Sequence, residues 1–253
     1  MLSSKKWLFF DVGNVILNDD PGVAYIYKKI HDAIIAKGID LSFDDLLHER
    51  GRMFHDRDKK LVQDLMLKYF TVEEAKNIRK SYSQDGFTRW GELNPLIPKA
   101  KDFVEACSQR YHLGVIANQP AVCRDVLIEH DLLKHFKVVA LSEAVGKSKP
   151  DADLFRWALK EADADPSESI MLGDRVDNDV RPAKSLGFTT IHFKLNVYDK
   201  IDGHNRSDEL NVYLPHVDRY NISMREPTSE EETPHYTASS YEELSRHLLT
   251  DTY

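Results

Sequence analysis

Three carboxylates and a lysine lie just beyond short apolar runs, at points where the chain would leave a buried strand. Asp11 follows the apolar run at residues 7–10, and Asp174 and Asp179 lie in the segment GDRVDND. Lys149 lies in the segment GKSKPD, which follows another apolar run. Carboxylate oxygens suit a hard cation such as Mg²⁺, which usually binds together with a phosphate. These residue types therefore favour magnesium-assisted chemistry on a phosphate group, provided that the fold brings them together.

Short apolar strands that alternate with helical segments are the elements that would position these residues. Strands are predicted at residues 7–10, 113–117, 138–141, 169–174 and 189–193, and a last short strand with a closing helix within 235–249. The alternation predicts a doubly wound, Rossmann-like α/β core, with a parallel sheet and helices on both of its faces. Ligands of such sheets bind beyond the carboxyl ends of the strands. We therefore expect the carboxylates and the lysine to converge there.

Residues 20–94 have a different character and predict a small helical unit. Lys, Asp, Glu and His are frequent there, and the apolar residues recur at helical spacing. We therefore expect a helical cap domain at residues 19–94, inserted into a core made of residues 1–18 and 95–253. A polar segment at residues 196–233 interrupts that core. We expect part of this segment to be ordered and to border the cap or the mouth of the site.

Length, charge and cysteine content narrow the class of protein. The chain of 253 residues is long enough for one sizeable core and a small second unit. Its net charge of −8 argues against nucleic acid or an anionic membrane as the main partner. No secretory signal is visible, and no apolar run approaches the ~18 residues that a membrane helix needs. Cys107 and Cys123 lack metal-binding spacing and suit a reducing compartment, so we expect a cytoplasmic protein.

Four segments follow one another along the chain: FFDVGNV, LGVIAN, GKSKPDADLF and MLGDRVDND. With a helical insertion after the first of them, the chain resembles the haloacid dehalogenase-like hydrolase superfamily, in the subfamily whose cap follows motif one. The resemblance covers about residues 7–193 and again 235–249. It implies an enzyme with a doubly wound core and a helical cap. It also implies a reaction in which a small phosphorylated metabolite transfers its phosphoryl group to water.

The resemblance assigns the central roles to residues of motifs one, two and three. Asp11 would be the nucleophile, whose carboxylate attacks phosphorus and forms an aspartyl phosphate. Lys149 would neutralise charge on Asp11 and on the phosphoryl group, because a dianionic phosphate cannot approach a carboxylate without nearby cations. Asn118 could offer its main-chain N–H to a phosphoryl oxygen, with its side chain as a further donor.

The same resemblance implies a Mg²⁺ ion held by residues of motifs one and four. Its ligands would be the Asp11 carboxylate, the backbone carbonyl of Gly13 and the Asp174 carboxylate. Asp179 falls at the spacing of the second acid of motif four and would bind Mg²⁺ directly or through water. Together with Lys149, the cation would offset the charge of the phosphate.

Two positions depart from the pattern of the superfamily's phosphatases. Gly13 stands where most of them have a second aspartate, which protonates the leaving group and then activates water. Ala117 stands where motif two normally ends in Ser or Thr, whose hydroxyl bonds a phosphoryl oxygen. General acid–base help is worth about 10²- to 10⁴-fold in rate. We therefore expect a slow or specialised phosphatase that prefers acyl, aryl or anomeric phosphates, whose leaving groups need the least assistance.

Three other functions fit part of this pattern. A non-catalytic binding or regulatory protein on the same scaffold would explain the loss of two catalytic groups, although the retained acids and Lys149 argue against full decay. A dehalogenase would use Asp11 on carbon without a metal, but such enzymes lack the acidic motif four. A phosphonate-cleaving enzyme would need a cap lysine for a Schiff base, for which Lys59 and Lys60 are candidates.

Overall fold

The computed structural model of the chain describes residues 2–54, 61–201, 206–219 and 222–250. Within these ranges the chain divides into two compact units. The core unit comprises Met1–Asn18, Pro95–Asp202 and Ile222–Tyr253, and the helical unit comprises Asp19–Asn94 and Gly203–Asn221. Every helix of the described ranges is too short or too polar to span a bilayer.

A six-stranded parallel sheet forms the centre of the core unit, in the order β3-β2-β1-β4-β5-β6. Its strands are β1 (Trp7–Phe10), β2 (His112–Ala117), β3 (Phe136–Leu141), β4 (Ser169–Gly173), β5 (Thr189–Phe193) and β6 (Tyr236–Ala238). The prediction of a doubly wound α/β core is confirmed. The chain runs from β1 to β2 and β3 on one side and then crosses to β4 on the other, so the border of β1 and β4 is the topological switch point.

Helices of the core unit connect these strands or, in the case of the last helix, follow β6. They are α6 (Ala100–Ser108), α7 (Cys123–Glu129), α8 (Ser142–Val145), α9 (Ala152–Ala162), α10 (Arg181–Ser185) and α12 (Tyr241–Leu248). Shorter turns are η1 (Leu2–Ser4), η2 (Leu133–His135), η3 (Pro166–Glu168), η4 (Val176–Val180), η5 (Ile222–Met224) and η6 (Glu230–Glu232). All are 3-10 helical except η4, which is a single π-helical turn.

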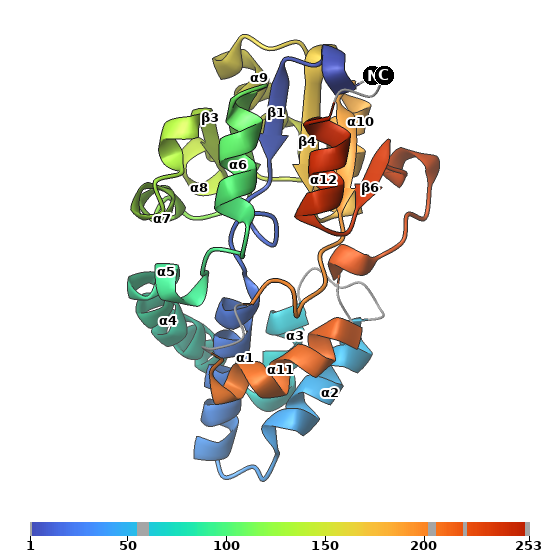
Figure 1. Ribbon diagram of the computed structural model, residues 1–253. Helices are drawn as coiled ribbons and strands as arrows, with labels where there is room; N and C mark the ends of the chain where they lie inside the picture. The colour runs from blue at the N-terminus through green and yellow to red at the C-terminus, as the bar shows by residue number, and fades with distance from the viewer. Residues whose placement is uncertain (1, 55–60, 202–205, 220–221, 251–253) are drawn as a thin grey trace. The chain divides into compact units, whose positions relative to one another are not determined.

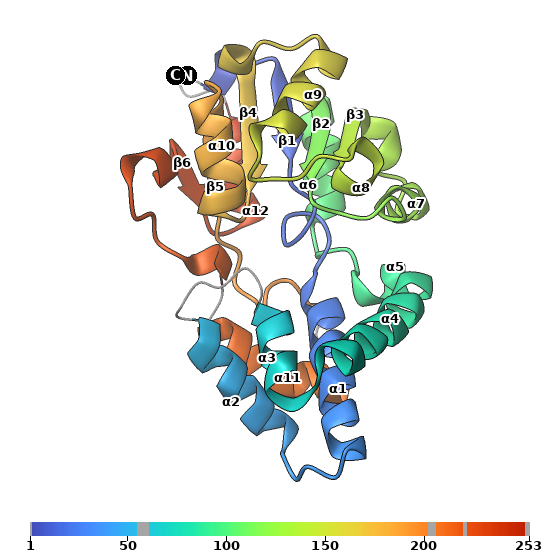
Figure 2. The same cartoon turned by 180° about the vertical axis from the view of Figure 1, so that it is seen from behind.

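Successive side chains of β1 point to opposite faces of the sheet. Trp7 and Phe9 belong to a buried cluster with Phe155 of α9. The ring of Phe10 instead lies 6.1 Å from that of Phe103 in α6, measured between centroids. Helices α6 and α12 cover one face of the sheet (Figure 1), and α9 and α10 cover the other (Figure 2). Because β1 is buried on both faces, its continuously apolar sequence follows from its central position.

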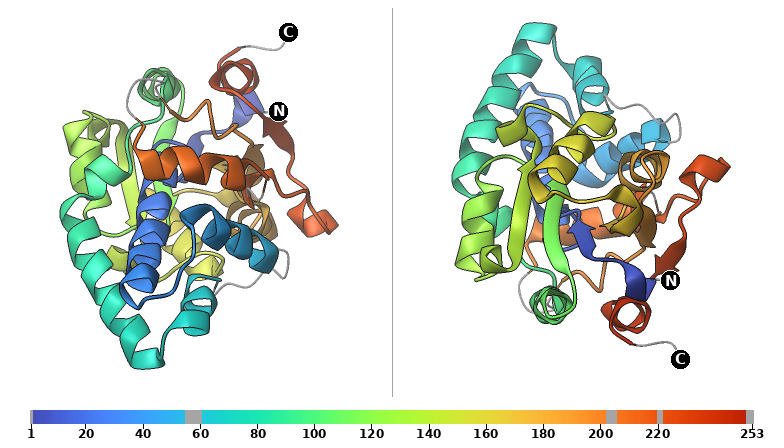
Figure 3. Two further views of the ribbon diagram at one scale, coloured as in Figure 1. Left: turned by 90° about the horizontal axis from the view of Figure 1, so that it is seen from below. Right: turned by 90° about the horizontal axis from the view of Figure 1, so that it is seen from above.

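The helical unit consists of α1 (Asp20–Ala36), α2 (Phe43–Phe54), α3 (Leu61–Tyr69), α4 (Val72–Thr88), α5 (Trp90–Leu93) and α11 (Asp208–Arg219). The first five come from one continuous stretch of the chain, whereas α11 comes from the polar segment 196–233. α11 lies across α1 and against α2 (Figure 3, left). The ring of Tyr213 in α11 stacks on that of Tyr27 in α1, with 6.2 Å between centroids.

A buried apolar stripe explains why α11 joins the helical unit. The residues of this stripe recur at helical spacing and are Leu210, Tyr213, Leu214 and Val217. The sequence places the whole of 196–233 in the core, whereas the structure groups its middle part with the helical unit. Four spaced apolar residues are enough to bury one face of a short helix, even when the rest of the segment is polar.

Candidate active site

Asp11 and Asp174 lie at the switch point of the sheet, directly after β1 and β4. Asp11 continues the strand ladder, because its N–H donates to the carbonyl of Leu172 at 2.8 Å. Its carboxylate oxygen Oδ1 accepts the N–H of Val12 at 2.7 Å. Hydrogen bonds to the sheet thus fix the backbone of Asp11, and both carboxylates stand at the carboxyl edge of the sheet.

Lys149 reaches this edge from the loop between α8 and α9 and bridges two carboxylates. Its Nζ lies 2.9 Å from Oδ1 of Asp11 and 2.6 Å from Oδ1 of Asp179. The side chain of Asn118 fixes the loop, because its Oδ1 accepts the N–H of Lys149 at 2.7 Å and its Nδ2 donates to the carbonyl of Lys149 at 2.8 Å. The side chain of Asn118 is therefore engaged in positioning Lys149.

Asp179 reaches the cluster through the π-helical turn η4. Its Oδ2 accepts the N–H of Arg175 at 3.0 Å, and the residue is fully buried. Gly173 makes room for it, because a Cβ at this position would lie 2.4 Å from the Asp179 side chain. Any side chain at Gly173 would therefore displace Asp179. In the same turn, Nη2 of Arg175 pairs with Oδ2 of Asp177 at 2.7 Å.

Three carboxylates and one ammonium group share this buried volume. Burial raises the pKa of Asp11 to about 8, with Lys149 opposing the shift and the other two carboxylates adding to it. Burial and the charge of Asp179 raise the pKa of Asp174 to about 6. Burial alone would lower the pKa of Lys149, but Asp11 and Asp179 outweigh it and raise that pKa to about 12. The site holds more negative than positive charge.

The donor set of this cluster fits a hard divalent cation. Asp11, Asp174 and Asp179 each offer one carboxylate oxygen, and these oxygens lie within 4.8 Å of one another. Such all-oxygen sets suit Mg²⁺, which fills its remaining coordination positions with water or phosphate. A divalent cation would also offset the burial and the mutual repulsion that raise the pKa values of Asp11 and Asp174.

The two positions that depart from the superfamily pattern are both buried. Ala117 ends β2 and is 0% exposed. Gly13 follows β1 in a turn in which the N–H of Ile16 donates to the carbonyl of Val12 at 2.8 Å. Gly13 is not among the described glycines with a positive φ, whereas the next residue, Asn14, has a φ of 55°. The left-handed backbone at this turn thus falls on Asn14, a residue type that tolerates it.

A second buried lysine, Lys200, lies at the turn of motif one and was not predicted. Its Nζ donates to Oδ1 of Asn14 at 2.8 Å, and the residue is 2% exposed. The Nδ2 of Asn18 donates to its carbonyl at 3.3 Å. The charge of Lys200 also opposes the burial that raises the pKa of Asp174. Lys200 therefore adds a second positive charge beside motif one.

Two further residues missed by the sequence contact Asp174. The hydroxyl of Ser223 in η5 donates to its Oδ2 at 2.5 Å. The Nε2 of His192 in β5 lies 2.9 Å from its carbonyl oxygen, which can only accept, so this nitrogen carries a proton. Burial lowers the pKa of His192, which favours the neutral ring. Asp174 is thus held by both its backbone and its side chain.

Lys200 and Ser223 both belong to the polar segment 196–233. Because this segment follows β5, it begins at the carboxyl edge of the sheet, where ligands bind in such folds. However, nothing in its composition separates these two residues from their polar neighbours. Lys59 and Lys60, the candidates for a Schiff base, lie outside the described residues.

Comparison with known proteins identifies a family. A sequence model described as haloacid dehalogenase-like hydrolase matches residues 5–187. The chain is 27% identical over 206 residues to the glyceraldehyde 3-phosphate phosphatase of Pyrococcus furiosus, covering 78% of this chain and 84% of that protein. It is 24% identical over 207 residues to the glyceraldehyde 3-phosphate phosphatase of Methanocaldococcus jannaschii, covering 80% and 91%.

Solved structures share the fold. A HAD phosphatase from Thermococcus onnurineus has a TM-score of 0.57 at 23% identity, covering 96% of this chain and 97% of that one. The HAD-hydrolase YfnB from Bacillus subtilis, bound to magnesium, has a TM-score of 0.63 at 18% identity, covering 97% and 99%. Because the family match extends over residues 5–187 and the fold agrees with it, the chain belongs to the haloacid dehalogenase-like hydrolases.

Proposed function

We propose that the protein is a phosphatase that hydrolyses a small phosphorylated metabolite through an aspartyl phosphate on Asp11. The observation that carries this proposal is the buried pair of Asp11 and Lys149, in a cluster with Asp174 and Asp179 at the switch point of the sheet. Relatives named glyceraldehyde 3-phosphate phosphatase support a phosphate monoester as the substrate. A triose or sugar phosphate is the first class of substrate to test.

Mg²⁺ is the cofactor that this cluster would hold. Its ligands would be the carboxylates of Asp11, Asp174 and Asp179 and the carbonyl of Gly13. When bound, Mg²⁺ would offset negative charge on the phosphoryl oxygens. The excess of carboxylates over ammonium groups at the site supports this assignment.

The reaction uses the chain's own groups in two steps. The Asp11 carboxylate attacks phosphorus, and the bond from phosphorus to the leaving oxygen breaks. Water then attacks the same phosphorus, which releases phosphate and restores the Asp11 carboxylate. The ammonium group of Lys149 lies beside Asp11 and reduces the repulsion between its carboxylate and the phosphate. Asn118 contributes its main-chain N–H to a phosphoryl oxygen, because its side chain is engaged with Lys149.

The leaving oxygen needs help that Gly13 does not supply. Lys200 is suited to give it, because Asn14, the residue after Gly13, holds its Nζ at 2.8 Å. The ammonium group stabilises negative charge on the departing oxygen, and water provides the proton that completes the alcohol. Lys200 thereby compensates in part for the aspartate that other phosphatases of the superfamily have at this position.

The proposal is tested by phosphate release from a panel of phosphorylated metabolites, including glyceraldehyde 3-phosphate, in the presence of Mg²⁺. We expect hydrolysis of at least one member. In Asp11→Asn the rate should fall by at least about 10³-fold, because an amide cannot form the acyl phosphate. Asp153→Asn alters an exposed aspartate that pairs with Lys147, and it should keep wild-type activity.

Two results would count against this function. Wild-type activity in Asp11→Asn would exclude Asp11 as the nucleophile. A wild-type protein that binds phosphorylated metabolites with Mg²⁺ but hydrolyses none would favour the alternative, a non-catalytic binding or regulatory protein. Gly13 and Ala117, which stand in place of the usual catalytic residues, are the observations that support this alternative.

A further inference from the structure

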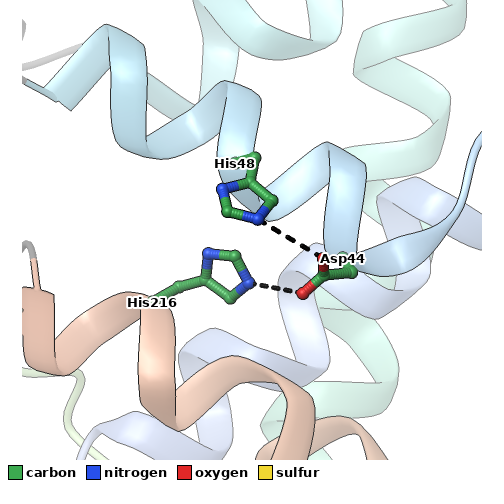
Figure 4. A group of neighbouring side chains, drawn as sticks. All are labelled: Asp44, His48 and His216. Atoms are coloured by element: carbon green, nitrogen blue, oxygen red, sulfur yellow. Dashed lines mark hydrogen bonds and ion pairs between the residues drawn. The ribbon is translucent and has the colours of Figure 1, made fainter.

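A second group of side chains that could hold a metal ion lies in the helical unit, and none of its residues belongs to the four motifs. Asp44 and His48 come from α2, and His216 comes from α11 (Figure 4). Asp44 and His48 are four residues apart, so they lie on one face of their helix. Packing of α11 against α2 brings His216 to the same place. Two segments that are far apart in the sequence therefore meet at this cluster.

The three side chains direct their ligand atoms toward one another. Nε2 of His216 lies 2.8 Å from Oδ1 of Asp44, and Nε2 of His48 lies 3.4 Å from Oδ2 of the same carboxylate. The two imidazole rings are 4.6 Å apart between centroids, and their planes differ by 83°. One ligand atom from each residue lies within 4.8 Å of the others. Donors about 3.4 Å apart surround a tetrahedral ion with bonds of about 2.1 Å. Small rotations of these side chains would reach that spacing.

Burial differs among the three residues in a way that suits a metal site. The side chain of His216 is only 7% exposed, so packing fixes its position. The side chains of His48 and Asp44 are 47% and 59% exposed, so they are free to adjust around an ion. Solvent also reaches the cluster from their side, so an ion could enter and could hold water as a fourth ligand.

We propose that Asp44, His48 and His216 form a site for a divalent transition metal of the zinc class. Two imidazole nitrogens and one carboxylate oxygen are a donor set that zinc accepts, whereas Mg²⁺ prefers oxygen alone. This separates the site chemically from the all-oxygen cluster of Asp11, Asp174 and Asp179. The ion ties α11 to α2 and so fastens the middle of the segment 196–233 to the helical unit.

Isothermal titration calorimetry of the full chain with zinc, in excess Mg²⁺, tests the site. We expect about one zinc ion per chain that Mg²⁺ does not displace, and a rise in Tm on zinc addition. In His48→Ala and Asp44→Asn, the affinity for zinc should fall by roughly 100-fold or more, because loss of a ligand exceeds loss of an outer-shell partner. His247→Ala changes an exposed histidine of the core unit and should bind zinc as the wild type does. Co²⁺ should give the visible absorption of a tetrahedral nitrogen and oxygen site.

Three outcomes would overturn the proposal. Zinc could bind no more tightly to the wild type than to His48→Ala, which would mean that the cluster is only a hydrogen-bonded contact between helices. The bound zinc could vanish in Asp174→Asn instead, which would place it at the carboxylate cluster. Equal rises in Tm for the wild type, His48→Ala and Asp44→Asn would also contradict it. These two variants alter exposed side chains, so both should fold, as circular dichroism can verify.

Discussion

The candidate active site draws on two regions of the core unit that are held in different ways. Asp11 and Asp174 end central strands, and the backbone of β1 is hydrogen-bonded to a neighbouring strand on each side. Lys200 contacts Asn14 in the turn after β1, and Ser223 contacts the carboxylate of Asp174. Both residues come from the segment between β5 and β6, outside the strands of the sheet. Sites on strands are positioned more precisely than sites on loops. The first region is therefore suited to the reacting groups. The second region is suited to groups that change the electrostatic environment of the reacting groups.

Side chains, rather than a strand ladder, hold the second region in place. Arg225 and Glu232 form a paired contact, with Nη1 and Nη2 at 3.0 and 2.7 Å from the two carboxylate oxygens. Glu232 also accepts the N–H and the hydroxyl of Thr228 at 3.0 and 2.9 Å. Lys184 of α10 donates to the carbonyl of Glu230 at 2.6 Å. The loss of one such contact should loosen the second region while leaving the sheet intact.

The largest effect is expected from Lys149→Met, which removes the cation that the loop between α8 and α9 supplies to the first region. This change leaves Asp11 and Asp179 buried without their shared cation, and an incoming phosphate then meets uncompensated negative charge. We expect kcat/KM to fall by roughly 10²- to 10³-fold in phosphate-release assays. Lys147→Met removes an exposed lysine from the same loop and is the matched control. Equal activity in the two variants would contradict the role of Lys149.

The same substitution in the second region, Lys200→Met, should cost less. It removes a charge from the neighbourhood of the leaving group but leaves the nucleophile and its lysine in place. We expect a loss of about tenfold for alkyl phosphates and a smaller loss for aryl phosphates, whose leaving groups need little stabilisation. The control is Lys194→Met, which removes a lysine that lies two residues before this segment and pairs with Glu226, and which therefore reports the effect of loosening the segment alone. A loss that is equal for both substrate classes would mean that Lys200 acts on something other than the leaving group.

Gly13→Asp sharpens the comparison by giving the first region the acid that it lacks. Without that acid, acyl, aryl and anomeric phosphates should be cleaved far better than alkyl phosphates. We expect Gly13→Asp to narrow this difference a few-fold by accelerating the alkyl phosphates. Gly13→Asn has nearly the same shape but no acidic proton, so it should leave the difference unchanged. If the wild type shows no dependence on the leaving group, another residue already serves as the acid.

The smallest effect concerns the stability of the second region at low pH. The bond to Arg225 lowers the pKa of Glu232 to about 2 from its ordinary 4.5, so folding favours the ionised form. Its contribution to stability is therefore present above pH 4.5 and is lost as the pH falls toward 2. In urea unfolding, the wild type should be more stable than Glu232→Gln at pH 7, and the difference should shrink by pH 3. A difference that is constant with pH would show that the charge of Glu232 has no part in it.

The first region could be predicted from the sequence because its physics is local. A strand buried on both faces must be continuously apolar, so a polar residue at its end is conspicuous, as Asp11 is after Phe10. Glycine before Asp174 is likewise required, because any side chain at Gly173 would meet Asp179. Composition and spacing therefore indicated both the strands and the carboxylates that follow them.

The second region and the cluster in the helical unit could not be predicted in this way. Lys200 is one of many charged residues in its segment, and only the folded chain buries it against Asn14. His48 and His216 are far apart in the sequence and become neighbours only because an apolar stripe docks α11 on α1 and α2. Contacts between distant segments depend on tertiary packing, on which short-range patterns give no information.

Formation of a beryllofluoride adduct at Asp11 tests most directly the central claim that this carboxylate is the nucleophile. Beryllofluoride mimics a phosphoryl group on a carboxylate, and its fluorine NMR signals report whether it is bound. With Mg²⁺ present, the wild type is predicted to give bound signals, whereas Asp11→Asn gives none and Asp153→Asn gives those of the wild type. Bound signals that persist in Asp11→Asn, or a wild type that hydrolyses phosphates without ever forming the adduct, would contradict the account.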